Sequence, residues 1–207
     1  MPSEHSATEE LLRRASQGDA AAVERLLTLH RDRLKRMISI RLDARLAARL
    51  DASDVVQEAL MDASRKLPDY LRTRPVPFYP WLRRLAWEKV VDAERRHVDA
   101  RRRSVAREEA RLTALPDHSS VQLAERLLAG GLSPAERLLR QEQLARVRLA
   151  LARLPDAYHE VLVLRYLEQL DTLETAAVLS VSEGVVKGRH RRALERLQLE
   201  LGPSIDE

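Results

Sequence analysis

The chain contains no cysteine and very few aromatic residues. The absence of cysteine excludes disulfide bonds, thiol catalysis and cysteine-ligated zinc. Aromatics make up only 3% of the residues, and the other strand-forming residues are also scarce, whereas alanine, leucine, arginine and glutamate are abundant. We therefore expect an all-α fold, with two small helical domains joined by a flexible linker.

Long apolar runs and cofactor motifs are also missing. No apolar run approaches the roughly 18 residues of a membrane span, and the acidic start of the chain has no signal-peptide pattern. We expect a cytoplasmic protein without a membrane span. The six histidines are scattered without ligand spacing, and no glycine-rich phosphate loop is present. We therefore predict no metal, no cofactor and no catalytic residue, and expect that the protein is not an enzyme.

The positive charges are bunched. The formal net charge is only +4, but arginines and lysines cluster at 95–103 and again at 187–196. Two separated basic clusters indicate contact with a long polyanion, such as DNA, at two places.

Helical periodicity and chain breakers divide the first half of the sequence. A helix is predicted over 8–37, broken at Gln17–Asp19. Cap-type residues at Asp51–Asp54 start the next helix, which Pro68 should end near Lys66.

Prolines at 75, 77 and 80 predict a loop over Tyr70–Pro80, followed by a helix from Trp81 to Arg103. Proline and glycine pairs then predict a linker. The expected domains are 8–103 and 135–201, with 104–134 as the linker.

The last part of the chain predicts a helix-turn-helix. A helix over 157–167 precedes a short helix to Leu179, a turn at Ser180–Ser182 and a basic helix over 183–199, which Ser182 can cap. Such a basic second helix can lie in a major groove, where arginine reads guanine edges and lysine holds phosphates. An ordinary charged surface helix would give the same pattern.

Three segments resemble bacterial RNA polymerase sigma factors, in the order found in that family. Asp51–Leu60 resembles the polymerase-docking helix. Phe78–Ala86, followed by Asp92 and Arg95, resembles the segment that melts and reads the minus-ten element. Leu154–Lys187 resembles the minus-thirty-five reader. The chain is similar to the two-domain, extracytoplasmic-function (ECF) subfamily.

The resemblance implies the partners and the site residues. The partners are the clamp helices of the largest subunit of core RNA polymerase, promoter DNA and an anti-sigma protein. The docking residues would be Asp54, Gln57 and Glu58. The minus-ten residues would be Phe78, Tyr79, Arg84, Trp87, Glu88 and Arg95. The minus-thirty-five residues would be Glu183, Val185, Lys187, Arg189, His190 and Arg191.

Helix geometry agrees with these roles. Asp54, Glu58 and Asp62 recur every fourth residue and form an acidic stripe suited to a basic protein surface, although a solvated acidic face gives the same stripe. The core face of this helix is predicted to carry Val56, Ala59, Ala63 and Leu67.

Aromatics interleaved with arginines suit unpaired bases. Trp81 is expected in the core, whereas core packing and DNA contact both remain open for Tyr79 and Trp87.

Several positions depart from the family pattern. Glu88 stands where asparagine is usual, Ser180 replaces a turn glycine, and Gly188 replaces a small polar residue in the recognition helix. Thr175 takes the place of a core aliphatic residue, and Val185 stands where threonine is frequent. These changes could shift the preferred promoter sequence.

The predicted function is that of a sigma factor directing promoter-specific initiation. A stand-alone helix-turn-helix regulator would need the basic last helix but neither the acidic helix nor the aromatic segment. An enzyme acting on nucleic acid would need ligand spacing or a phosphate loop, and the sequence has neither. A protein that binds polymerase but does not select promoters would keep only the acidic helix as its functional surface.

Overall fold

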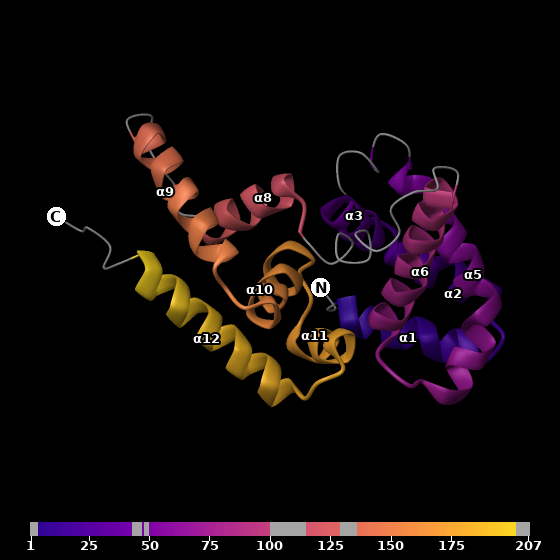
Figure 1. Cartoon of the computed structure of the whole chain (residues 1–207). Helices are drawn as coiled ribbons and strands as arrows, with labels where there is room; N and C mark the ends of the chain where they lie inside the picture. The colour runs from indigo at the N-terminus through magenta and orange to yellow at the C-terminus, as the bar shows by residue number, and fades with distance from the viewer. Residues whose placement is uncertain (1–3, 43–46, 48–49, 100–114, 129–135, 202–207) are drawn as a thin grey trace. The chain divides into compact units, whose positions relative to one another are not determined.

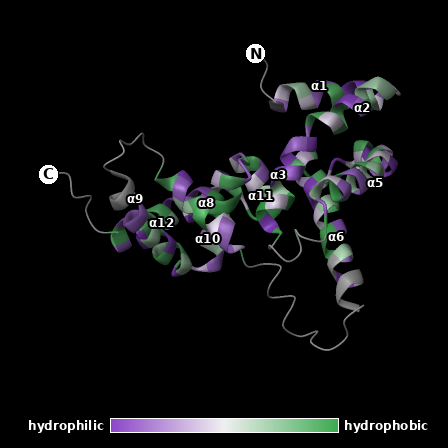
Figure 2. Cartoon of the chain, turned by 90° about the horizontal axis from the view of Figure 1, so that it is seen from above, coloured by the Kyte–Doolittle hydropathy of each residue, from purple (hydrophilic) through white to green (hydrophobic). Residues whose placement is uncertain are grey.

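A computed structural model of the chain describes residues 4–42, 47, 50–99, 115–128 and 136–201. The chain divides into two compact units, Met1–Ala114 and Leu115–Glu207. Every regular element in the described part is helical (Figure 1), which confirms the predicted all-α fold. Hydrophilic and hydrophobic residues are interspersed along the helices (Figure 2), as expected where one face of each helix packs in a core.

The first unit contains the helices α1 (Glu4–Ser16), α2 (Ala20–Leu29), α3 (Arg31–Arg41), α5 (Ala52–Thr73) and α6 (Phe78–Asp99). The second contains α8 (Asp117–Leu127), α9 (Glu136–Ala152), α10 (Asp156–Leu162), the π-helical turn η2 (Val163–Leu167), α11 (Thr172–Leu179) and α12 (Glu183–Leu201).

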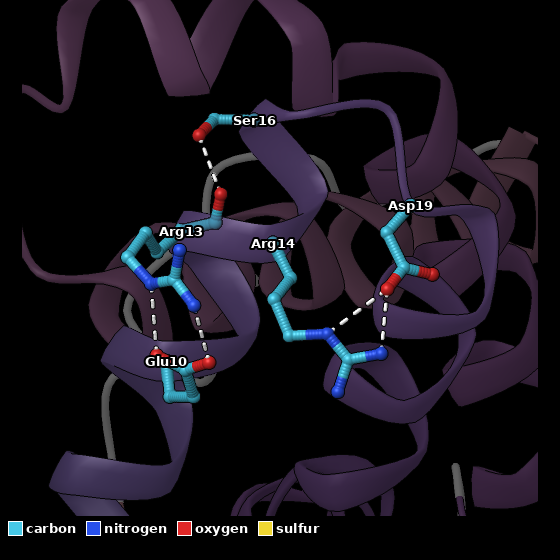
Figure 3. A network of polar contacts seen from close by, with 5 residues as sticks. All are labelled: Glu10, Arg13, Arg14, Ser16 and Asp19. Carbon is cyan, nitrogen blue, oxygen red and sulfur yellow. Dashed lines mark hydrogen bonds and ion pairs between the residues drawn. The ribbon is translucent and has the colours of Figure 1, made fainter.

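The predicted break at Gln17–Asp19 is confirmed, and a polar network holds it (Figure 3). Gly18 has a φ of +86°, a backbone conformation that favours glycine. Asp19 caps α2 by accepting the N–H of Ala22 at 3.0 Å, and its other carboxylate oxygen accepts the Nε–H of Arg14 at 2.9 Å. The hydrogen bond from Arg14 is the main reason why the pKa of Asp19 is lowered. A second break, at His30, was not predicted.

Helix α5 begins as predicted, with Asp51 as its N-cap, but it does not end near Lys66. It continues through Pro68 to Thr73. A proline inside a helix costs about 3 kcal/mol. Burial of Leu67 and Tyr70 on the core face offsets this cost, at roughly 1.5–3 kcal/mol for each large side chain.

The predicted loop over Tyr70–Pro80 is also wrong, because aromatic packing shortens it to residues 74–77. The rings of Tyr70 and Trp81 lie 4.6 Å apart, and Phe78 lies 5.5 Å from each of them. The Tyr70 hydroxyl donates to the carbonyl of Val76 at 3.0 Å, and burial raises the pKa of this tyrosine to about 12. This cluster starts α6 at Phe78 rather than at Trp81.

The core of the first unit follows the predicted helix faces. Val56, Ala59, Ala63 and Leu67 of α5 are all buried, as predicted, and so are Leu82, Ala86, Val90 and Ala93 of α6. Helices α5 and α6 lie side by side (Figure 1). The predicted end of α6, at Arg103, lies outside the described residues.

The second unit begins earlier than predicted. Helix α8 falls inside the predicted linker 104–134, yet it packs on α9 and η2, and its Leu123 and Ala124 are fully buried. The proline and serines of this segment mark the start of a helix rather than a linker. The rest of the predicted linker, 104–114 and 129–134, lies outside the described residues.

The helix-turn-helix has its predicted elements. Asp171 and Glu174 form a reciprocal capping box at the start of α11, and Ser180 turns the chain with a φ of +53°. Ser182 caps α12, its hydroxyl oxygen accepting the N–H of Val185 at 3.4 Å. Val186 of α12 packs against Val161 and Ala176.

Candidate polymerase and nucleic-acid interfaces

The predicted docking residues lie on one exposed side of α5. Asp54, Gln57 and Glu58 are all exposed, whereas the intervening Val55 and Val56 are buried. The third member of the predicted acidic stripe differs, because Asp62 is half-buried and forms an ion pair with Lys89 of α6, at 2.5 Å. Of the three carboxylates in the predicted stripe, Asp54 and Glu58 are therefore the two that are exposed.

Sequence reasoning missed Met61 on the same face. Its side chain is 50% exposed and follows Glu58 by three residues and Gln57 by four. The signal was present, because Met61 falls outside the periodicity of the core residues Val56, Ala59 and Ala63. Exposed methionine between polar side chains is suited to protein contact.

Helix α6 brings four of its six predicted residues to the surface or close to it. Arg84, Glu88 and Arg95 are exposed and Trp87 is half-buried. These side chains recur at helical spacing, so they share one broad face. The carboxylate of Glu88 lies 3.9 Å from the guanidinium of Arg84, so the unusual acidic residue is paired within the face. The side chain of Arg96 and residues 101–103 of the basic cluster lie outside the described residues.

Phe78 and Tyr79 do not form the exposed loop that was predicted for them. Both lie in the first turn of α6 and are only 2% exposed. The ring of His30 lies 5.4 Å from Phe78 and 5.7 Å from Tyr79. The guanidinium of Arg33 covers the Tyr79 ring at 3.7 Å. Tyr79 is therefore a core residue rather than an exposed DNA contact, as Trp81 is.

The recognition helix α12 exposes Glu183, Val185, Lys187 and Arg191. Two ion pairs run along it, Glu183 with Lys187 at 4.0 Å and Arg191 with Glu195 at 3.4 Å. Arg189 is half-buried.

His190, which the family resemblance placed among the minus-thirty-five residues, is less exposed than Lys187 and Arg191. The imidazole is half-buried and stacks on Tyr166 of η2, with ring centroids 5.7 Å apart. Its Nε2 lies 3.2 Å from the Tyr166 hydroxyl. Burial is the main reason why the pKa of His190 is lowered, and the nearby charge of Arg165 adds to the effect. This histidine joins the recognition helix to the element beneath it.

One departure within the helix-turn-helix has a structural explanation. Thr175 is fully buried, and its hydroxyl donates to the carbonyl of Asp171 at 2.6 Å, which satisfies the polar group in the core. Ser180 takes the left-handed conformation for which glycine is usual.

No helix in the described part of the chain is both long and apolar enough to cross a membrane.

These features define a class of protein: a two-unit helical factor with a helix-turn-helix in its second unit. Known families match both units. The model described as "Sigma-70 region 2" matches residues 26–100, and "Sigma-70, region 4" matches 144–197.

Relatives match over most of the chain. ECF RNA polymerase sigma factor SigD of Mycobacterium tuberculosis (strain H37Rv) is 30% identical over 187 residues, covering 90% of this chain and 80% of its own. ECF RNA polymerase sigma factor ShbA of Streptomyces griseus is 34% identical, covering 91% and 92%. The structure of CnrH in complex with the cytosolic domain of CnrY is 26% identical, with a TM-score of 0.49, and covers 92% and 94%.

The chain belongs to the ECF RNA polymerase sigma factors. As a member of this family, it directs promoter-specific initiation of transcription, and sigma factors are initiation factors rather than enzymes.

Proposed function

We propose that the exposed N-terminal part of α5 docks on the clamp helices of core RNA polymerase through Asp54, Gln57 and Glu58. The observation that carries this assignment is the exposed pair of carboxylates on a helix whose opposite side, from Val56 to Leu67, is buried. An acidic patch on a DNA-binding protein repels DNA and suits a basic protein surface. Met61 adds apolar contact area beside it.

The face of α6 formed by Arg84, Trp87, Glu88 and Arg95 contacts the minus-ten element. Arginines hold phosphates, while the partly exposed indole of Trp87 offers a ring on which an unpaired base can stack. Phe78 and Tyr79 support this face indirectly, because their buried rings hold the first turn of α6 in place.

Helix α12 reads the minus-thirty-five element in duplex DNA through Glu183, Val185, Lys187, Arg189 and Arg191. His190 supports this surface through Tyr166 and does not read bases itself. The exposed cations contact phosphates and base edges, and the N-terminal amides of the helix add affinity for phosphate.

These surfaces give the chain the role of binding polymerase and promoter DNA. Polymerase supplies the chemistry, so this chain needs no catalytic residue, metal or cofactor of its own. It works in the cytoplasm, where polymerase and promoters meet. Membership in the family also supports an anti-sigma protein that holds the factor inactive.

The docking surface is tested by charge reversal. Wild-type protein and the combined Asp54→Arg and Glu58→Arg variant are each mixed with core polymerase and separated on a sizing column. We expect the wild type to co-elute and the variant to elute alone. Circular dichroism should show the same helix content and thermal transition for both proteins.

The matched control reverses two exposed acidic residues on other helices, Glu24 of α2 and Asp32 of α3. Glu24→Arg with Asp32→Arg changes the net charge by the same amount and should leave co-elution intact. Equal loss in both variants would show that general charge, rather than this face of α5, governs binding. A wild type that fails to co-elute but binds a specific duplex alone would indicate the stand-alone regulator.

A further inference from the structure

Val185 is an apolar side chain with no role in the protein core. It lies in the first turn of α12 and is 41% exposed, whereas its neighbour Val186 is 1% exposed and packs against Val161. Valine forms helices less readily than alanine because its branched side chain loses rotamer freedom there. Neither packing nor helix propensity therefore explains a valine at this position.

Two glycines leave the surroundings of Val185 bare. Gly184 precedes it, and Gly188 follows one turn later on the same side of the helix. A Cβ built on Gly184 would come no nearer than 3.9 Å to a side-chain atom, the Ser182 hydroxyl oxygen. A Cβ on Gly188 would lie 4.0 Å from a guanidinium nitrogen of Arg192. The isopropyl group of Val185 thus lies beside two positions without side chains, with the guanidinium of Arg192 next to the second.

Arg192 is the charged residue that lies beside Gly188, and two ion pairs run along the same helix. Glu183 pairs with Lys187, and Arg191 pairs with Glu195. The outward surface around Val185 therefore presents an apolar group flanked by charged side chains, and Val185 cannot donate or accept a side-chain hydrogen bond.

Base edges in the major groove display one apolar group, the C5-methyl group of thymine. We infer that Val185 selects a thymine in the upstream promoter element by contact with this methyl group. The inference rests on the proposed role of α12 at the minus-thirty-five element and adds the base and the atom that Val185 recognises. Bare backbone at Gly184 and Gly188 lets the helix come close enough for this contact.

The test removes the methyl group and keeps base pairing. Polymerase holoenzyme containing the wild-type chain first selects a promoter from a random synthetic duplex pool. Each thymine of the upstream element is then replaced in turn by deoxyuridine, and the affinity of holoenzyme is measured. We expect one replacement to weaken binding about 4-fold, the value for one buried methyl group. The synthetic duplex carries methyl groups on thymine alone, which excludes methylated cytosine as the source.

Variants of Val185 assign the effect to this side chain. Val185→Ala should bind the thymine and uracil duplexes with affinities that differ by less than about 2-fold, and Val185→Thr, which keeps one methyl, should remain sensitive. Leu199→Ala is the matched control, because Leu199 is an exposed apolar residue, 82% exposed, at the other end of α12. It should retain the full wild-type sensitivity.

Two outcomes would overturn the inference. Wild-type holoenzyme could be indifferent to every thymine replacement, or Val185→Ala could keep the same sensitivity as the wild type. Failure of the proposed role of α12 would give a different result. In that case Lys187→Ala and Arg191→Ala would also leave binding to the upstream duplex unchanged.

Discussion

The ammonium nitrogen of Lys89 lies 2.5 Å from a carboxylate oxygen of Asp62 and joins helix α6 to helix α5. Both side chains are mostly shielded from solvent, with exposed fractions of 24% and 21%. Their mutual hydrogen bond is the main reason why the pKa of Asp62 is lowered and that of Lys89 is raised. The pair links two helices of the first unit, each of which carries a proposed contact surface.

We predict that Asp62→Asn and Lys89→Gln each lower the free energy of unfolding by about 1 kcal/mol, and that the double variant loses less than the sum. Urea titration of the four proteins measures this coupling. The carboxylate has a lowered pKa in the folded state, so its contribution is present above the ordinary aspartate range and is lost as pH falls through the folded pKa. Fully additive losses would show that the pair is not coupled.

Ser180 should be a site of stabilisation, because it turns between α11 and α12 with a φ of +53°. A left-handed conformation costs a residue with a Cβ about 1 kcal/mol, and glycine avoids this cost. Ser180→Gly should therefore raise the free energy of unfolding of the second unit by up to ~1 kcal/mol. Thermal melts monitored by circular dichroism measure the change.

Gly18 provides the converse control for this prediction. It has a φ of +86°, and a Cβ there would meet no atom within 4 Å. Gly18→Ala should lower stability through backbone strain alone. Stabilisation by both substitutions, or by neither, would contradict the argument from φ.

A substitution at Gly188 should stabilise the protein for a different reason. This glycine lies within α12, its backbone is helical, and a Cβ there would make only an ordinary contact, at 4.0 Å. Glycine costs a helix interior roughly 1 kcal/mol relative to alanine. Gly188→Ala should therefore raise the melting temperature, while the added methyl group crowds the surface beside Val185 and lowers promoter affinity. Higher stability with unchanged promoter affinity would show that the glycine has no part in DNA binding.

Helix faces could be predicted well from the sequence, because periodicity reports burial directly. Val56, Ala59, Ala63 and Leu67 all fall where the pattern placed them. The cap residue Asp51 likewise indicated the correct start of α5, since its carboxylate accepts the Ser53 N–H locally, at 2.7 Å.

Features that depend on distant contacts were not predictable in this way. Pro68 should have ended α5, but packing of Tyr70 on Trp81 of the next helix outweighs the local preference. Helix α8 was predicted as linker because its breaker residues are local signals, whereas the burial of Leu123 depends on other helices.

The burial of Phe78 and the stacking of His190 on Tyr166 also require the three-dimensional arrangement. Aromatic residues and histidine suit a core as well as a DNA surface, and only tertiary structure decides between the two.

The contact between His190 and Tyr166 should make the second unit sensitive to pH. Burial lowers the pKa of His190 below its ordinary value, with a further contribution from Arg165. The folded state therefore binds a proton less readily than the unfolded state. The neutral imidazole contributes its full stability above the ordinary histidine pKa, and that contribution is lost as pH falls through the folded pKa.

Unfolding free energies of variants are measured at about pH 7.5 and about pH 5.5, on either side of the ordinary histidine pKa. They separate the effect of burial from that of the hydrogen bond to Tyr166. The difference in unfolding free energy between the wild type and His190→Gln should shrink as the pH falls. Tyr166→Phe removes the hydroxyl but keeps the ring, so most of the wild-type pH dependence should survive, because burial rather than the hydrogen bond is the main cause. A proton NMR titration, with His190→Gln used to assign the resonance, measures the pKa directly. A value above that of an ordinary histidine would mean that the protonated form is held in place, and the sign of the pH dependence would be reversed.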